Sequence, residues 1–359
     1  MPFVGTFQQL CHNGQTFAIH LNVTREVGPL KVLVVGAGRM GSIRVEDLSS
    51  DPRVDEVLIT NRSREKAEHL AAKFGAKVID WAMATKTTAD AVVVAVGTDA
   101  HEEILKPILA RGLPVLCEKP ISLDLASTEA AISLAKESGS QIQVGFQRRF
   151  DPSFREIKNQ IDAGRLGTLY SMTMTAHDKT PSPREFIAGS GGIFRDLHVH
   201  DFDLIRWLTD SEVESVFATK AVRQHFDYAD FDDADVSSVI VKTVSGVQVL
   251  VSGTRHDALG QDVRIEVFGS KNSVSAGLNS RTPLSTVENQ LATNVDAYSG
   301  FVDRFREAFA QETQSFVSFI VGEIPNPCPP ESALESLRIA IACEESVATN
   351  AAVKLLEVS

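Results

Sequence analysis

Three polar side chains in this sequence, Lys119, Asp196 and His200, are of the types that move protons and stabilise developing negative charge. Asp196 and His200 are i and i+4, so on a helix that runs on from Asp196 they would share a face. A carboxylate beside an imidazole orients the ring and raises its basicity, which suits a general base for alcohol oxidation near neutral pH. Lys119 follows an apolar strand within Glu118-Lys119-Pro120, where its ammonium would hold a substrate oxygen and stabilise negative charge on it.

Other interpretations of these residues are open. Lys119 could be a solvated lysine at a strand end, and the Asp196 and His200 pair could be an ordinary contact on a helix surface. A metal site is a third interpretation, with candidate ligands His198, His200, Asp201 and Asp203. On a helix, however, His198 and His200 point apart, and further ligands are not evident, so no metal is predicted.

A glycine-rich turn precedes these residues in the chain. Gly36-Ala37-Gly38-Arg39-Met40-Gly41 fits GxGxxG directly after an apolar strand and at the start of a helix, which is the context that gives this pattern its meaning. Gly36 permits the tight turn, Gly38 lets the backbone approach a pyrophosphate, and Gly41 allows close helix packing. The helix N-terminus, at Arg39 and Met40, offers free N–H groups to phosphate oxygens. We therefore expect a bound dinucleotide.

The choice between NAD and NADP depends on the end of the second strand. A carboxylate about 20 residues after the glycines usually binds the ribose 2′-hydroxyl, but Asn61-Arg62-Ser63 stands there. A 2′-phosphate would not be repelled, and Arg62 with the Ser63 hydroxyl would pair with it. NADP or dual use is therefore favoured, although Arg62 and Arg64 also fit as solvated residues at a helix start.

The elements that must position these residues follow from the hydrophobic pattern. Apolar runs rich in β-branched residues predict strands over 32–35, 56–60, 91–96, 114–117 and 141–145. Between them, helical patterns cover 40–48, 64–74, 101–111 and 122–138, the last with Ser122 as its N-cap. This βαβ alternation predicts an α/β fold that begins with a doubly wound parallel Rossmann sheet.

The pattern changes after Asp151-Pro152. Longer strand candidates lie at 169–176, 213–222, 236–243, 247–252 and 263–268, and helices are expected over 301–321 and 331–348. A second α/β domain with a large open, mostly antiparallel sheet is predicted, its helix 301–321 either lining the site or covering a sheet. The expected organisation is an extension at 1–29, a dinucleotide-binding domain at 30–150, and a substrate-binding and oligomerisation domain at 151–359. If the natural start lies near Val27, the extension is an annotation artefact.

Composition excludes several classes of function. The formal net charge of −12 over 359 residues disfavours partners with phosphate backbones or anionic lipid surfaces, so neither nucleic acid nor membrane is expected. The four cysteines are scattered without a CxxC pair, which argues against a disulfide framework. No apolar run approaches the ~20 residues of a membrane span. A cytoplasmic location is predicted.

Four ordered motifs give the chain a family resemblance. They are residues 34–41, residues 115–120, Val144 to Asp151, and Gly191 to Asp196 with His200-Asp201. On these motifs the chain resembles the glucose-fructose oxidoreductase and inositol dehydrogenase (Gfo/Idh/MocA) family, and is closest to its inositol 2-dehydrogenase branch. The resemblance implies an NAD(P)-dependent dehydrogenase of sugars or polyols, with catalytic residues at Lys119, Asp196 and His200. It also implies association through the second sheet, and we expect a homodimer or homotetramer.

The family pattern also identifies departures in this sequence. Asn61 replaces the usual acid, Thr98-Asp99 stands where many members have Thr-Pro, and His198 occupies the place of a smaller residue. These changes bear on cofactor choice and on the shape of the substrate. Further candidates for contact with the cofactor are Thr98, His101, Glu118 and Lys119.

The expected reaction is oxidation of a secondary hydroxyl of a cyclic polyol or sugar. His200, oriented by Asp196, would take the hydroxyl proton while Lys119 stabilises the oxyanion. Arg149, His177 and Asp178 are candidates for binding other substrate hydroxyls, although each could be a salt-bridge residue instead. The alternatives are another pyranose or glycoside as substrate, imine or biliverdin-type reduction, and a regulator that binds the dinucleotide without catalysis.

Overall fold

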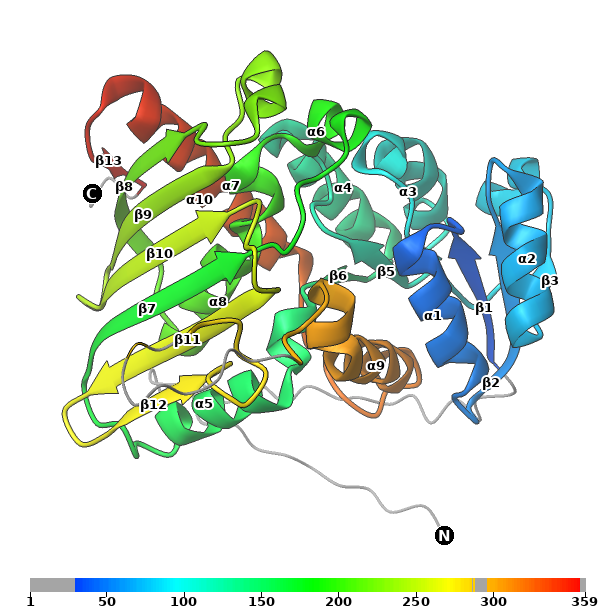
Figure 1. Ribbon diagram of the computed structural model, residues 1–359. Helices are drawn as coiled ribbons and strands as arrows, with labels where there is room; N and C mark the ends of the chain where they lie inside the picture. Colours follow the sequence, from blue (N-terminus) through cyan, green and yellow to red (C-terminus); the bar gives the residue numbers. More distant parts are fainter. Residues whose placement is uncertain (1–29, 286, 288–295, 356–359) are drawn as a thin grey trace, which may run out of the picture.

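The computed structural model describes residues 30–285, 287 and 296–355. The predicted extension 1–29, with its proposed start near Val27, lies outside the described residues. Two sheets stand side by side, with helices packed on and between them (Figure 1). Within the described residues, no helix is both long and apolar enough to span a membrane.

The first sheet is parallel and six-stranded, in the order β3-β2-β1-β4-β5-β6. Its strands are β1 (Leu30–Val35), β2 (Val54–Thr60), β3 (Lys77–Val78), β4 (Ala91–Val94), β5 (Val115–Glu118) and β6 (Ile142–Gly145). The connecting helices are α1 (Arg39–Ser49), α2 (Arg64–Phe74), α3 (His101–Leu109) and α4 (Leu125–Ser138). The Rossmann prediction is confirmed, because β1 and β4 are buried on both faces as their continuous apolar runs indicate.

One helix start differs from the prediction. α4 begins at Leu125 rather than at Ser122, and its N-cap is Asp124. The Asp124 carboxylate accepts a hydrogen bond from the backbone N–H of Ser127 at 2.8 Å, while the Ser122 hydroxyl bonds to the same carboxylate. An ionised side chain at the cap also interacts favourably with the positive end of the helix dipole, so Asp124 displaces the serine.

The second sheet has seven strands in the order β12-β11-β7-β10-β9-β8-β13. They are β7 (Leu169–His177), β8 (Val213–Ala221), β9 (Val236–Thr243), β10 (Gln248–Thr254), β11 (Asp262–Gly269), β12 (Ser273–Ala276) and β13 (Val353–Lys354). All neighbours pair antiparallel except β7 and β10, which are parallel. The expectation of a mostly antiparallel sheet is therefore confirmed.

Helices cover one face of the second sheet (Figure 1). They are α5 (Pro152–Asp162), α8 (Val199–Thr209) and α10 (Pro330–Thr349), with the short helices α6 (Arg184–Ser190) and α7 (Ile193–Asp196) near the first sheet. Short 3₁₀ helices occur at η1 (Trp81–Lys86), η2 (Thr98–Ala100), η3 (Gln147–Phe150) and η4 (Phe226–Phe231). The alternation in β7, with Met172 and Met174 buried, directs every second side chain into this helix-covered core.

The helix α9 (Phe301–Ile320) returns from the second half of the chain to the first sheet. Its Phe316 and Val317 are fully buried in one cluster with residues of β1 and β4. The later turns of α9 therefore cover the first sheet, while Phe301 at its start packs under Arg39 of the glycine-rich turn.

A buried ion cluster fixes α9 to α1 and β5. The guanidinium of Arg44 binds Glu118 at 2.8 Å and Glu312 at 2.5 Å, and all three side chains are almost sealed from solvent. Burial raises the pKa of Glu312 to about 8, against the pull of Arg44 and with a contribution from Glu118. The guanidinium of Arg44 offsets part of the cost of burying Glu312, which is a partner that the Glu312 carboxyl needs at this depth.

Candidate active site

Lys119 and Asp196 meet across the two halves of the molecule. The Nζ of Lys119 donates to the Asp196 Oδ1 at 2.9 Å and to the Asp196 backbone carbonyl at 2.7 Å. Lys119 directly follows β5 at the carboxyl edge of the first sheet, where open α/β sheets bind their ligands. Both side chains keep a small exposed fraction, 18% and 15%, so the pair remains open to a small molecule.

The predicted helix from Asp196 onward is wrong in one respect that matters. α7 ends at Asp196 and α8 begins only at Val199, so Leu197 and His198 break the helix. Asp196 therefore does not orient His200. The Nδ1 of His200 has no hydrogen-bond partner among the described residues, and both carboxylate oxygens of Asp196 bind cations instead.

His200 is nevertheless prepared to accept a proton. Its side chain is buried, with its ring edge-on to Phe146 at 5.7 Å between centroids. Burial lowers the pKa of His200 well below its usual value, and the nearby cations Lys119 and Arg148 lower it further. The imidazole is therefore neutral at physiological pH, as a general base must be.

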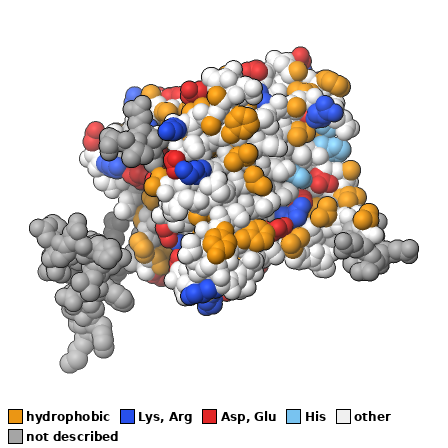
Figure 2. All heavy atoms as spheres, turned by 90° about the vertical axis from the view of Figure 1, so that its left-hand side faces the viewer, with side chains coloured by type: hydrophobic (Ala, Val, Ile, Leu, Met, Phe, Trp, Pro, Cys, Tyr) orange, Lys and Arg blue, Asp and Glu red, His pale blue; other side chains and the backbone are white. Residues whose placement is uncertain are grey.

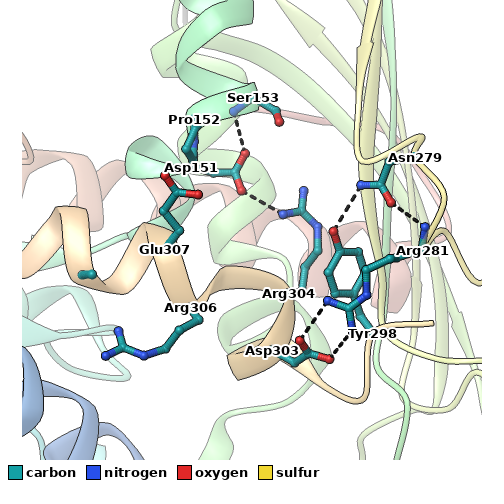
Figure 3. Close-up of a pocket in the computed structure, with 11 residues that line it drawn as sticks. Asp151, Pro152, Ser153, Asn279, Arg281, Tyr298, Asp303, Arg304, Arg306 and Glu307 are labelled. Atoms are coloured by element: carbon teal, nitrogen blue, oxygen red, sulfur yellow. Dashed lines mark hydrogen bonds and ion pairs between the residues drawn. The ribbon is translucent and has the colours of Figure 1, made fainter. Parts of the chain in front are cut away.

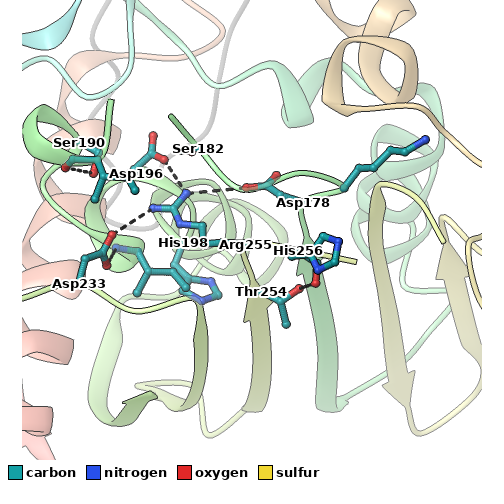
Figure 4. A network of polar contacts seen from close by, with 12 residues as sticks. Asp178, Ser182, Ser190, Asp196, His198, Asp233, Thr254, Arg255 and His256 are labelled. Carbon is teal, nitrogen blue, oxygen red and sulfur yellow. Dashed lines mark hydrogen bonds and ion pairs between the residues drawn. The ribbon is translucent and has the colours of Figure 1, made fainter. Parts of the chain in front are cut away.

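Arg255 is a member of the site that the sequence patterns did not single out. It follows β10 directly, its side chain is only 2% exposed, and its Nη1 donates to the Asp196 Oδ2 at 2.7 Å (Figure 4). Burial alone would raise the pKa of Asp196, but Lys119 and Arg255 hold it at about 2. Asp196 is thus a permanent anion. The one available signal was an arginine at the end of a predicted strand.

Asp178 joins the same network. Its carboxylate lies 3.8 Å from Arg255 and accepts a hydrogen bond from the Gln261 amide at 2.9 Å (Figure 4). Burial raises the pKa of Asp178, while Arg255 and Gln261 oppose the shift. The structure therefore places the predicted substrate-binding Asp178 beside Asp196.

Two other candidates for substrate binding have different partners. Arg149 is buried and bidentate with Asp203, at 2.7 and 2.6 Å, and also donates to Ser332. His177 shares a sheet face with Ser252, to which it is hydrogen-bonded at 3.0 Å, and lies 3.7 Å from Asp257. Arg149 is therefore a structural ion-pair residue, which was the alternative weighed for it. His177 belongs to a neighbouring group with Ser252 and Asp257. It does not join Asp178, the next residue, because successive side chains along an extended chain point in opposite directions.

The candidate metal ligands around His198 do not converge. His198 is fully buried and bonds through Nδ1 to Asp201 and through Nε2 to the Ser237 hydroxyl. Arg148 pairs with Asp201, and Arg149 with Asp203. His198 thus serves the core of the second domain. The only described group with metal-like spacing is His177, Asp257 and Asp262, with ligand atoms within 4.8 Å of one another.

The glycine-rich turn has the geometry of a phosphate cradle. A Cβ on Gly36, whose φ is +117°, would lie 2.4 Å from the Ala95 carbonyl oxygen, and one on Gly41 would lie 2.0 Å from that of Gly36. By contrast, a Cβ built on Gly38 meets no described atom within 4 Å. Gly38 is the N-cap of α1, and no described side chain caps that helix, so its first N–H groups are free for an anion.

Comparison with known proteins agrees with this geometry. The family model described as "Oxidoreductase family, NAD-binding Rossmann fold" matches residues 30–146, and the GFO/IDH/MocA C-terminal domain matches residues 154–275. The inositol 2-dehydrogenase of Rhizobium meliloti is 35% identical over 88% of this chain and 96% of its own length. The chain belongs to the Gfo/Idh/MocA family of oxidoreductases.

Solved structures of inositol dehydrogenases resemble this family member closely. A myo-inositol dehydrogenase from Corynebacterium glutamicum matches with a TM-score of 0.84 at 30% identity, over 92% of this chain and 100% of the other. A scyllo-inositol dehydrogenase from Lactobacillus casei, with bound NAD(H) and scyllo-inositol, matches with a TM-score of 0.81 at 25% identity, over 91% and 99%. The glycine turn fits the NAD that this family binds.

Some of the residues predicted to contact the cofactor form hydrogen bonds or ion pairs within the protein itself. His101 is buried, with its Nδ1 3.0 Å from the Pro120 carbonyl and its Nε2 3.3 Å from that of Val96. Glu118 is held by Arg44, as described above. Thr98 begins the 3₁₀ helix η2 beside the end of β4. His101 and Glu118 therefore brace the strand ends from which Lys119 and Thr98 project.

A separate pocket lies away from Lys119 and Asp196. It has a volume of ≈ 660 Å³ between α5, α9 and the loop around Asn279 (Figure 3). Its arginines are matched by carboxylates, with Arg304 2.8 Å from Asp151 and Arg281 2.8 Å from Asp303. Neither Lys119 nor any other predicted site residue lines it. Its size therefore does not make it the active site.

The two glycines with opposite surroundings make a matched test of the cradle. In Gly38→Ala, the added methyl enters open space, so the free energy of unfolding should stay within about 0.5 kcal/mol of wild type. NADH affinity, measured by fluorescence titration, should nevertheless fall by about tenfold or more because the methyl keeps the pyrophosphate from the backbone. Gly41→Ala should lower the melting temperature. Unchanged NADH binding by a stable Gly38→Ala would contradict the assignment.

Proposed function

We propose that this protein is an NAD-dependent dehydrogenase that oxidises a secondary hydroxyl of a cyclic polyol, of the inositol 2-dehydrogenase type. The observation that carries the proposal is the partly buried Lys119–Asp196 ion pair, 2.9 Å long, at the carboxyl edge of the Rossmann sheet, together with a neutral His200. The names of the relatives, which are inositol dehydrogenases, support the substrate class.

Each of the three residues has a role that follows from its charge. His200 is neutral and therefore can take the hydroxyl proton. Negative charge that develops on the substrate oxygen next to the ring stabilises the protonated imidazole during this step. Lys119 donates to the same oxygen and stabilises the negative charge that develops there. Asp196 stays ionised and fixes the direction of the Lys119 ammonium. Bound NAD supplies the acceptor for the hydride.

Asp178 is the proposed reader of a second substrate hydroxyl. Its carboxylate is 22% exposed and is held from behind by Arg255 and Gln261. A carboxylate fixed in this way accepts hydrogen bonds from a hydroxyl group in one orientation only. We also propose that residues 30–150 form the cofactor domain and residues 151–359 the substrate domain, with the Lys119–Asp196 pair between them.

The proposed activity is tested by following NADH absorbance with myo-inositol, other inositols and aldopyranoses. We expect turnover with an inositol, and a loss of about 10² to 10⁴-fold in kcat for Lys119→Met and for His200→Gln, with the double variant no worse than additive. Tight NADH binding without turnover on any polyol would instead support the regulator. Turnover with pyranoses alone would support the sugar alternative.

The pH profile gives an additional readout of the same experiment. Because the pKa of His200 is lowered, the base stays neutral as the pH falls through 6.5. We therefore expect kcat/KM to hold its plateau at pH 6.5 and to fall only at lower pH, when His200 becomes protonated. An acid limb centred above pH 6.5 would contradict His200 as the base.

We propose that the protein uses NAD and also accepts NADP. Asn61 stands at the end of β2 and its Oδ1 accepts a hydrogen bond from the Ala37 N–H at 3.1 Å, so no carboxylate repels a 2′-phosphate there. Arg62 lies 5.4 Å over the Trp81 ring and pairs with Glu103 at 3.0 Å. Both partners of this pair are 60% exposed, and an exposed pair is weak enough for a phosphate to displace Glu103.

Two substitutions separate these effects. Arg62→Ala should lower kcat/KM for NADP by about tenfold and leave that for NAD within about twofold, because only the 2′-phosphate needs the guanidinium. Glu103→Gln should raise kcat/KM for NADP, since Arg62 is released. Equal effects of both substitutions on NAD and NADP would reject the assignment of Arg62.

We propose that the chain forms a homodimer or homotetramer through the second sheet. The face away from the helices exposes Ile240 and Leu250, which are 49% and 54% exposed and pair directly across β9 and β10. Figure 2, which faces the side of the molecule that carries this sheet, shows groups of hydrophobic side chains among polar ones. An exposed apolar row of this kind favours association. The buried free thiols Cys117, Cys328 and Cys343 support a reducing, cytoplasmic location.

Light scattering after gel filtration tests the assembly. We expect a mass of two or four chains for wild type and a smaller assembly for Ile240→Arg with Leu250→Arg, because two buried charges would oppose each contact. Phe226→Arg is the control, since Phe226 is also exposed and apolar but belongs to η4. A monomeric wild type, or dissociation by the control alone, would rule out this interface.

A further inference from the structure

We infer that Arg255 is a positioning residue for the reaction, one guanidinium that places both Asp196, which directs Lys119, and Asp178, which faces the substrate. The inference rests on the proposed function and adds to it a residue that connects the reacting end of the site to its recognition end. Arg255 would act through the two carboxylates and would not touch the reacting atoms itself.

The contacts of Arg255 show how one side chain serves both groups. Its Nη1 lies 2.7 Å from the Asp196 Oδ2 and 3.8 Å from the Asp178 Oδ2. Its Nη2 lies 3.9 Å from the Oδ2 of Asp233. Figure 4 shows the guanidinium in the middle of these three carboxylates. Only the contact with Asp196 is a hydrogen bond, and the other two are ion pairs at longer distance. The guanidinium spreads its charge over two nitrogens that face different carboxylates, whereas a lysine ammonium offers one point charge.

The surroundings keep this guanidinium in place. Arg255 is buried against the Tyr228 ring, 6.0 Å from its centroid, and the Tyr228 hydroxyl accepts a hydrogen bond from the Ser182 N–H. Asp233 in turn accepts a hydrogen bond from the Ile193 N–H at 2.8 Å, at the start of α7. The helix that ends in Asp196 is thus tied at its other end to a second partner of the same arginine.

The sharing of Asp196 explains why two cations are needed. Oδ1 binds Lys119 and Oδ2 binds Arg255, so the carboxylate cannot rotate without breaking a charge-assisted bond. Without Arg255, the carboxylate could turn toward Lys119 with either oxygen, and only the bond to the Asp196 backbone carbonyl would still direct the ammonium. Asp178 would keep Gln261 but lose its nearest cation.

The test compares Arg255→Met with Arg255→Lys. Arg255→Met should lower kcat by about 10²-fold, as expected for a reacting group displaced by about 1 Å, and should raise KM for the polyol. Arg255→Lys keeps the charge next to Asp196 but not the guanidinium, so it should recover kcat to within about tenfold of wild type while KM stays high. NADH affinity should be unchanged in both, because neither carboxylate belongs to the glycine turn.

Arg304→Met is the matched control for a merely structural role. Arg304 is also a buried arginine, 2.8 Å from Asp151, but among the described residues it forms no hydrogen bond or ion pair with Asp196 or Asp178. It should lower the melting temperature and leave KM unchanged. The inference fails if Arg255→Met lowers only the melting temperature, as the control does. It also fails if Arg255→Lys has the same kcat and KM as Arg255→Met.

A readout without turnover separates this inference from the proposed function. Acylation of Lys119 by an amine-reactive ester, followed by peptide mass spectrometry, should be severalfold slower in Arg255→Met than in wild type. The ester reacts only with the unprotonated amine, and without the competing charge of Arg255 the Asp196 anion stabilises the Lys119 ammonium more strongly. Arg304→Met should label at the wild-type rate. Slower labelling of Arg255→Met with no turnover of any polyol by wild type would reject the proposed function alone. Unchanged labelling with normal wild-type turnover would reject the role of Arg255 alone.

Discussion

The arrangement of the whole site depends on one buried carboxylate held between two cations. Asp196 lies at the end of α7, where Lys119 reaches it from the first sheet and Arg255 from the second. A buried charge is costly unless it is paired and hydrogen-bonded, so neither cation can be withdrawn without leaving the carboxylate exposed to that cost. The two halves of the chain are therefore held in the relative position that also brings His200 beside Lys119.

The same charges set two opposite protonation states. Lys119 and Arg255 keep Asp196 ionised, whereas burial, with smaller contributions from Lys119 and Arg148, lowers the pKa of the neighbouring His200 and keeps it neutral. A site in which one group is a lasting anion and the next a neutral base has its acid–base roles assigned by environment. Burial favours the neutral form of both groups. For His200 that is the form observed, whereas for Asp196 it opposes ionisation, so Asp196 needs two cations and His200 needs no hydrogen-bond partner.

A second buried cluster supports Lys119 from behind. Glu118 precedes it in β5 and is held by Arg44, whose other partner, Glu312, comes from α9. Because α9 packs on the first sheet, the residues after the second sheet return to brace β5, the strand that Lys119 directly follows. Lys119 is thus fixed in two ways. Its ammonium is paired with Asp196 of the second half, and the preceding residue, Glu118, is held by the buried Arg44.

The sequence by itself determined the Rossmann sheet and the glycine turn, because these depend on local periodicity and on residues a few positions apart. It also singled out Lys119, Asp196 and His200 as candidates, through short local motifs. The break at Leu197 and His198 was decided by tertiary structure, since His198 turns into the second sheet toward Ser237, where only Gly253 leaves room for its ring. With that break, Asp196 exchanged His200 for Arg255, 59 residues away. No spacing rule reports such a partner, because buried charges are matched by whichever strand the fold brings near.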